Sequence, residues 1–205
     1  MIKGPRVLAL TGDENGCTLW RVWQPYTELQ RRGYGAWFRH KDDPEMQGFE
    51  WAYLAHTRLD AVVLPRFSWR EQHIPHRWVR ALHKAGLAVI YDVDDDVFSP
   101  QIGERQHVTT EKEKPLDVLE RDRRDRIAAL RLCDGVTTSN PTLAVLLEQY
   151  VSPGTPVVVV PNGIDTRWFR RTIRETRRET EALTIGWAGG ARVREDLEPI
   201  AAACD

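Results

Sequence analysis

Short apolar runs alternate with segments of helical periodicity over residues 1–165, and this alternation restricts the fold more than any other feature of the sequence. Runs of this kind are expected to be strands: Arg6–Leu10, Ala36–Phe38, Ala61–Leu64, Leu87–Asp92, Gly135–Thr138 and Val157–Val160. Nearly continuous apolar strands are typical of a sheet that is buried on both faces. The pattern therefore predicts an α/β fold with a Rossmann-like, doubly wound parallel sheet.

Between the expected strands, apolar residues recur three or four positions apart, as they do in amphipathic helices. Helices are expected at Leu19–Leu29, Phe49–Ala55, Trp78–His83, Leu116–Leu130 and directly after Ser139-Asn140-Pro141. Proline is favoured at the first position of a helix, which supports a helix start at Pro141. The stretch Phe98–Pro115 is polar and has no sustained periodicity, so we expect it to be a loop.

A second strand, turn and helix are expected near the end of the sequence. Residues 1–165 would form the first domain and the arginine-rich residues 166–182 a linker. Residues 183–205 would then begin a second Rossmann-like unit with a strand, a glycine turn and one helix. A single unit of this size cannot bury its own apolar surface, so we expect a truncated second domain or one completed by a separate chain.

Composition excludes several classes of protein. The chain has 205 residues, of which 41% are hydrophobic and 29% charged, with a formal net charge of -1, so it has no overall attraction to nucleic acid or to anionic lipid. Its apolar runs are far shorter than the roughly 20 residues that a transmembrane helix needs. The amino terminus has no signal-peptide pattern, and Cys17, Cys133 and Cys204 show no metal or disulfide spacing. A cytoplasmic protein with reduced thiols is expected.

The first expected loop, Gly12–Gly16, is a candidate anion site because it joins a strand to a helix, where backbone amides favour negative charge. Arg21 follows within that helix and could assist. The loop has neither the GxGxxG pattern of dinucleotide sites nor the GK[ST] ending of a loop that binds nucleoside triphosphates. An ordinary strand-to-helix turn remains an equal alternative.

The densest polar cluster is the acidic stretch that includes Asp92, Asp94, Asp95 and Asp96, at the end of an expected strand. Ligands of open α/β sheets bind at the carboxyl ends of the strands. These carboxylates could bind a divalent cation, orient sugar hydroxyls or supply a base whose pKa is raised by its neighbours. The structural alternative is an acidic loop that caps a short helix or pairs with arginines.

Two further turns are candidates for binding a ligand. Asn162 and Gly163 follow the last expected strand of the first domain, and could be either a plain turn or part of a cleft. Gly189 and Gly190 precede Arg192 in the second unit, where glycine amides and a guanidinium could bind a diphosphate.

In their order along the chain, several motifs resemble those of the family 4 glycosyltransferases of the GT-B fold, in a bacterial or phage-like branch. They cover nearly the whole sequence: Gly16-Cys17-Thr18-Leu19-Trp20-Arg21, Tyr91–Phe98, Cys133–Ser139, Val159–Asp165 and Ile185–Gly190. The resemblance implies transfer of a sugar from a nucleotide-sugar donor to an acceptor, with retention of anomeric configuration and generally without a metal or other cofactor. The acceptor would be a glycan, a lipid-linked molecule or a small molecule.

The same resemblance implies roles for the candidate residues. The donor would be bound by Gly12, Gly16, Arg21, Asn162, Gly163, Gly189, Gly190 and Arg192. The catalytic, acceptor-side residues would be Asp92, Asp94 and Asp95, and acceptor choice would reside in Phe98–Pro115. The paired glutamates with which the family holds its donor have no counterpart before Asp205, so the 205-residue chain is expected to bind donor poorly.

Two rival interpretations stay open. In the first, Asp92–Asp96 would bind Mn²⁺ or Mg²⁺ in a metal-dependent GT-A glycosyltransferase, although that fold does not explain a new strand and glycine turn after residue 183. In the second, the chain would be a non-catalytic acceptor-binding module that needs a separate donor domain.

Overall fold

The computed structural model describes residues 2–11, 16–40, 58–65, 75–99 and 116–167. The chain divides into two compact units, Met1–Thr166 and Arg167–Asp205. All the described helices and strands belong to the first unit. Most of the expected linker, the second strand, turn and helix, and the helix expected at Phe49–Ala55 lie outside the described residues.

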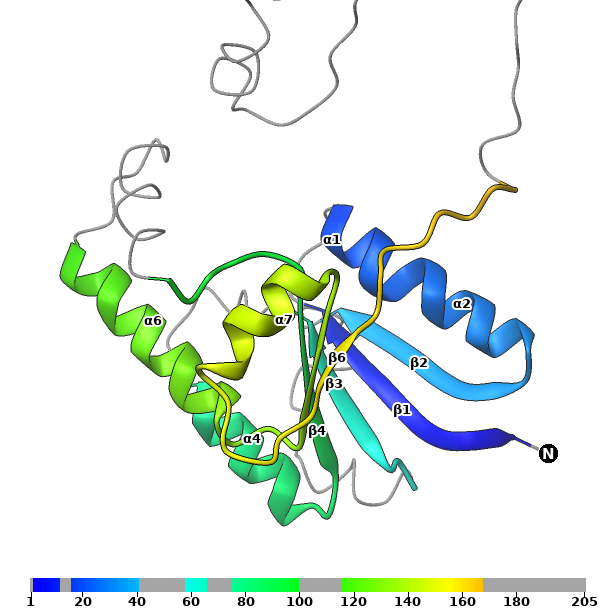
Figure 1. The fold of residues 1–205 in the computed structure, drawn as a ribbon. Helices are drawn as coiled ribbons and strands as arrows, with labels where there is room; N and C mark the ends of the chain where they lie inside the picture. Colours follow the sequence, from blue (N-terminus) through cyan, green and yellow to red (C-terminus); the bar gives the residue numbers. More distant parts are fainter. Residues whose placement is uncertain (1, 12–15, 41–57, 66–74, 100–115, 168–205) are drawn as a thin grey trace, which may run out of the picture. The chain divides into compact units, whose positions relative to one another are not determined.

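Six parallel strands form one sheet in the order β2-β1-β3-β4-β5-β6 (Figure 1). The strands are β1 (Lys3–Thr11), β2 (Tyr34–His40), β3 (Ala61–Pro65), β4 (Ala88–Val93), β5 (Gly135–Thr138) and β6 (Val157–Val159). The described helices are α1 (Gly16–Thr18), η1 (Leu19–Trp23), α2 (Gln24–Arg31), α4 (Pro75–Lys84), α6 (Leu116–Leu130) and α7 (Pro141–Glu148). The predicted α/β, Rossmann-like fold is confirmed.

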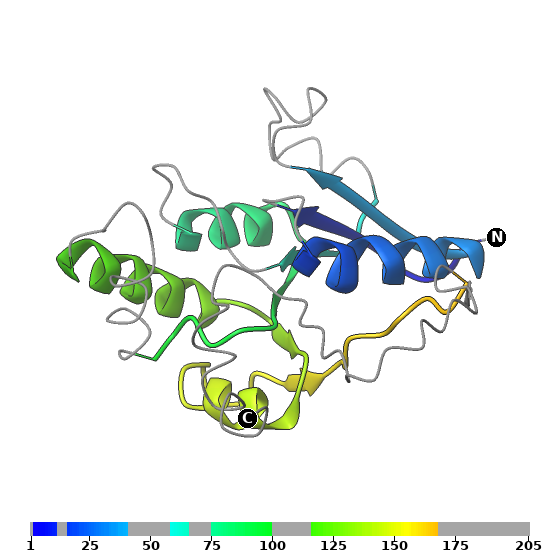
Figure 2. The ribbon, with the colours of Figure 1, turned by 90° about the horizontal axis from the view of Figure 1, so that it is seen from above.

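Alternate residues of each strand point to opposite faces of the sheet, and each face has its own core. On one face Leu8 and Leu10 of β1 belong to the larger core, to which α4, α6 and α7 contribute Val79, Leu82, Ala129, Leu130, Leu143 and Leu147. On the other face Ala9 packs with Val22 and Tyr26. Figure 1 and Figure 2 both show α2 beside β1 and β2, with α6 on the other side of the domain.

The start of the expected polar loop belongs to the core. Phe98 is fully buried, stacks on Tyr150 with ring centroids 5.8 Å apart and meets Tyr91 edge to face at 6.1 Å. The Asp96 carboxylate accepts hydrogen bonds from the backbone N–H groups of Phe98 and Ser99, which turns the chain back toward the sheet. Phe98 lies in a bend, as the loop predicted from Phe98 onward requires, while local turn chemistry returns its aromatic ring to the core. Residues 100–115 of that predicted loop lie outside the described residues.

The strand order reverses at β1. The chain runs from β1 to β2 on one side, and β3 then pairs with β1 on the other side. In open α/β sheets the helices diverge at such a reversal, and ligands bind beside it at the carboxyl ends of the strands. Among the helices that the structure describes, none has the length and apolar character needed to cross a bilayer.

The burial of Phe98 can be tested by substitution. Phe98→Ala removes a fully buried ring, so it should lower the free energy of unfolding by about 3–5 kcal/mol in urea titrations followed by circular dichroism. Val158→Ala is the control, because that side chain is 51% exposed on β6 and its loss should cost about 0.5 kcal/mol or less. Equal stability of the two variants would contradict the burial of the Phe98 ring.

Candidate functional site

The site begins with a local irregularity in the first helix. Pro25 has no N–H, and inside a helix its ring clashes with the carbonyl of the residue four positions earlier, which is Arg21. The chain widens at this point into the π-helical turn η1, in which the N–H of Gln24 donates to the carbonyl of Leu19, five residues back. Single π-helical turns inside α-helices are often found at functional sites. Arg21 lies in the middle of this turn.

Arg21 forms a two-pronged ion pair with Asp92 of β4. Its Nε donates to Asp92 Oδ2 at 3.1 Å and its Nη2 donates to Asp92 Oδ1 at 2.5 Å. The two side chains are only 5% and 7% exposed. Two parallel hydrogen bonds between a planar guanidinium and a carboxylate restrict the orientation of both groups in addition to the charge attraction between them. The pair therefore fixes both side chains.

Asp92 is directed to this face of the sheet by its place in β4. Ala88, Ile90 and Asp92 alternate with Val89, Tyr91 and Val93, which belong to the larger core on the opposite face. Thr137 is the register partner of Asp92 on β5, and its hydroxyl donates to Asp92 Oδ1 at 2.6 Å. Both carboxylate oxygens of Asp92 therefore already accept hydrogen bonds from the protein.

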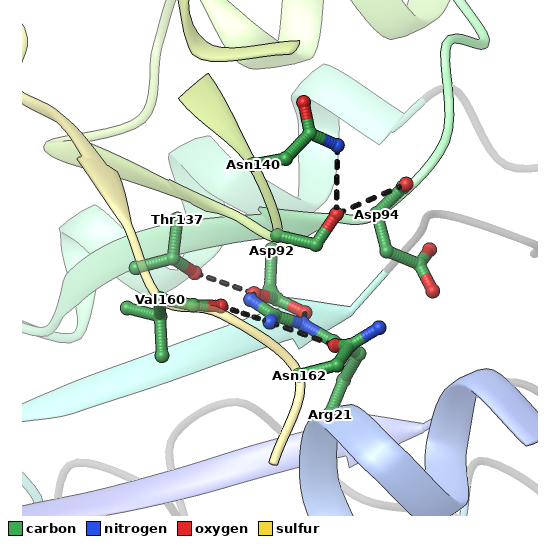
Figure 3. Close-up of polar contacts among 8 residues, drawn as sticks. Arg21, Asp92, Asp94, Thr137, Asn140, Val160 and Asn162 are labelled. Carbon is green, nitrogen blue, oxygen red and sulfur yellow. Dashed lines mark hydrogen bonds and ion pairs between the residues drawn. The ribbon is translucent and has the colours of Figure 1, made fainter. Parts of the chain in front are cut away.

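The other side of the Arg21 guanidinium binds the segment that follows β6 (Figure 3). Its Nη1 donates to the backbone carbonyl of Val160 and to Asn162 Oδ1, the latter at 3.1 Å. With one bond from Nε, two from Nη1 and one from Nη2, Arg21 uses four of its five N–H groups within the protein. At most one N–H remains for a ligand.

Tyr26 of α2 lies close to this ion pair. Burial, together with the negative charge of Asp92, raises the pKa of the Tyr26 hydroxyl above its usual range. The hydroxyl is therefore neutral throughout the physiological pH range, and Tyr26 cannot supply a phenolate base there.

The carboxylates that follow β4 have different surroundings. The backbone carbonyl of Asp94 accepts a hydrogen bond from the Ser139 hydroxyl at 3.3 Å, a contact drawn in Figure 3. Side-chain ligand atoms of Cys17, Asp94 and Asp95 lie within 4.8 Å of one another, so these three residues could hold a metal ion. A thiolate with two carboxylates suits zinc or another transition metal better than Mg²⁺, which prefers oxygen ligands alone.

Asn140 confirms the predicted helix start at Ser139-Asn140-Pro141. Its Oδ1 accepts a hydrogen bond from the backbone N–H of Leu143 at 2.8 Å, which is the usual role of an N-cap side chain. Its Nδ2 donates to the Ser139 hydroxyl at 3.3 Å. The cap and the contact to Asp94 thus join the start of α7 to the end of β4.

The predicted site residues are only partly brought together. Arg21, Asp92 and Asn162 form one hydrogen-bonded group, and Asp94 and Asp95 lie near Cys17. Gly16 is the first residue of α1, and Gly163 is exposed in the segment after β6. Gly12, Gly189, Gly190 and Arg192 lie outside the described residues. The donor-binding and catalytic roles given to all these residues remain predictions.

Sequence reasoning did not assign roles to Thr137 and Gln24. Thr137 contacts Asp92 only because β4 and β5 pair in one particular register. Gln24 accepts a hydrogen bond through Oε1 from the backbone N–H of Asp165 at 3.3 Å, across 141 residues of sequence. Pro25 inside a helical pattern was the one available signal, since it marks an irregular turn that contains Arg21 and ends just before Gln24.

No protein-family model matches the chain, and a search of curated proteins finds no match either. The motifs of the sequence, the fold and the geometry of the site are therefore the grounds on which a function can be argued.

The ion pair can be tested by its energetics. Arg21→Met leaves the carboxylate of Asp92 buried without its partner, and the free energy of unfolding should fall by about 3–5 kcal/mol. The double variant R21M/D92L should be more stable than R21M, because no buried charge remains. Urea denaturation of both variants measures this difference.

The matched control is Arg31→Met on α2, whose side chain is 60% exposed beside Glu28, and it should change stability little. A double variant that is no more stable than R21M would show that the Arg21–Asp92 charges do not depend on each other.

Proposed function

We propose that this chain is the acceptor-side part of a GT-B-type glycosyltransferase that uses a nucleotide-sugar donor. One observation carries the proposal. Arg21, Asp92, Thr137 and Asn162 come from the four resembling motifs within the first unit, and they meet in a single hydrogen-bonded group. The parallel sheet brings the carboxyl ends of its strands to one edge, and each of the four motifs supplies a side chain to the polar group formed there.

The position of this group supports the same proposal. It lies at the carboxyl ends of β4 and β5 and beside the end of β6, near the reversal of strand order, where α/β sheets bind their ligands. Polar groups on adjacent strand ends are what a sugar acceptor with several hydroxyls needs for recognition.

In this proposal the aspartates divide the work. Asp92 is nearly buried and has both carboxylate oxygens engaged, so it holds the site together through Arg21 and Thr137. Asp94 is half-buried and Asp95 is exposed, so these two carboxylates can approach an acceptor hydroxyl. They would orient the hydroxyl or accept its proton as the new glycosidic bond forms. Backbone amides of the Gly12–Gly16 loop would approach the donor phosphates.

The proposal is tested with a protein that carries this chain together with a complete second domain. Nucleotide-sugars are screened by release of nucleoside diphosphate, first with simple sugar acceptors. With the substrate so found, Asp94→Asn should lower kcat by about a hundredfold or more, because a neutral amide cannot accept the proton.

Glu148→Gln is the matched control for Asp94→Asn, since Glu148 is exposed at the end of α7 and its substitution should leave kcat unchanged. Absence of transfer with every nucleotide-sugar, or an equal effect of the two substitutions, would contradict the proposed function.

The cluster of Cys17, Asp94 and Asp95 favours one alternative, a metal-dependent transferase. A divalent ion held there would neutralise the leaving diphosphate of the donor. Treatment with EDTA followed by gel filtration distinguishes the two mechanisms. We expect transfer to survive this treatment, and we expect Asp95→Asn to be insensitive to added Mn²⁺ or Zn²⁺. Loss of activity on chelation, restored by one of these ions in the unsubstituted protein but not in Asp95→Asn, would instead support the metal-dependent alternative.

A further inference from the structure

Residues 160–165 leave the sheet and pass beside the first helix, where side chains of that helix contact them. Strand β6 ends at Val159, and the N–H of Val160 makes a final backbone hydrogen bond to the carbonyl of Thr138. Beyond this point the segment has little burial of its own, since Val160 is 45% and Ile164 is 65% exposed. Among the described residues, no backbone pairing holds the segment beyond Val160.

Two side chains from neighbouring turns of the first helix bind this segment. Arg21 of η1 donates to the carbonyl of Val160 and to Asn162 Oδ1, and Gln24 of α2 accepts from the N–H of Asp165. The contacts are spaced along the segment at residues 160, 162 and 165, so they hold it at both ends. Asp92 makes no direct hydrogen bond to the segment. It fixes the guanidinium of Arg21 from the other side, and it accepts a hydrogen bond from Thr137, whose neighbour Thr138 binds the N–H of Val160.

We propose that Arg21 and Gln24 form a clamp that fixes residues 160–165 against the first helix, and that Asp92 sets the strength of this clamp through Arg21. Arg21 is thus a positioning residue that joins the end of β4 to the segment leading into Arg167–Asp205. Any change at Asp92 is transmitted to residues 160–165 without direct contact between them. This inference does not depend on the proposed sugar transfer.

The physical reason lies in the geometry of the guanidinium. A planar group with five N–H donors can bind a carboxylate on one edge and two acceptors on another at the same time. A lysine ammonium keeps the charge but has its three donors on one atom at the end of a flexible chain, so it cannot hold both edges in fixed directions. The π-helical turn sets the place from which Arg21 reaches both partners.

Amide hydrogen exchange of the 205-residue chain, followed by NMR, tests the clamp directly. The Asp165 N–H reports on the segment, because its acceptor is Gln24 Oε1. The Val136 N–H, which donates to the carbonyl of Pro156 within the sheet, reports on the sheet itself. The measured quantity is the exchange rate of Asp165 relative to that of Val136, which separates local release from a general loss of stability.

Arg21→Lys and Asp92→Asn should each raise this relative rate at least tenfold, and Arg31→Lys at the exposed end of the same helix should leave it unchanged. The result for Asp92→Asn is decisive, because Asp92 is not a direct partner of the segment. If the relative rate in Asp92→Asn stays within twofold of the unsubstituted protein, the proposed role of Asp92 is refuted. The same result for Arg21→Lys refutes the clamp itself.

A second pair of variants tests the clamp from the exposed side, where folding is not at risk. Asn162→Ala removes one acceptor of Arg21, and the relative exchange rate of Asp165 should rise. Asn162→Asp keeps an acceptor and adds a charge that attracts the guanidinium, so the rate should equal that of the unsubstituted protein or fall below it. Equal rates in the two variants would overturn the proposal even if Arg21→Lys failed to fold.

Discussion

The buried ion pair between Arg21 and Asp92 is the interaction on which the rest of the site depends. A guanidinium and a carboxylate removed from water lose hydration that only well-directed hydrogen bonds can replace. The protein supplies these bonds from four separate segments: η1, the end of β4, β5 and the residues after β6. The cost of leaving the buried guanidinium or the buried carboxylate without a partner is what holds these segments in one arrangement.

This arrangement gives the acidic stretch after β4 a division of roles. Asp92 is committed to Arg21 and Thr137, and Asp96 is committed to the backbone of the turn at Phe98 and Ser99. Four carboxylates so close in sequence would repel one another if all faced the same space, and pairing two of them within the protein relieves that repulsion. Asp94 and Asp95 lie where a substrate or an ion could reach them, so the chemistry proposed for the site rests on these two carboxylates.

Much of the fold could be predicted because its signals are local. Apolar runs such as Ala61–Leu64 and Val157–Val160 matched strands within one or two residues, and Asn140 with Pro141 marked a helix start that the cap geometry confirms. Contacts between residues far apart in the sequence could not be predicted in this way. The local pattern places Phe98 at the beginning of a polar loop but gives no sign that its ring is buried, because the Asp96 turn and the ring of Tyr150 become visible only in the structure. The sequence allows an aspartate of this stretch to pair with an arginine, but it does not identify Asp92 and Arg21 as the pair.

The sequence by itself determined the class of the fold and the residues available for chemistry, since apolar periodicity selects a parallel α/β sheet and Asp92, Asp94 and Asp95 stand at a strand end. It also contained Pro25, whose missing N–H produces the irregular turn. Only the tertiary structure decided that Arg21 would bind Asp92 and residues 160–162 instead of an anionic ligand. The reason is that the order of the strands and the register of β4 with β5 bring these groups together. Neither the strand order nor the register can be read from any short stretch of the chain.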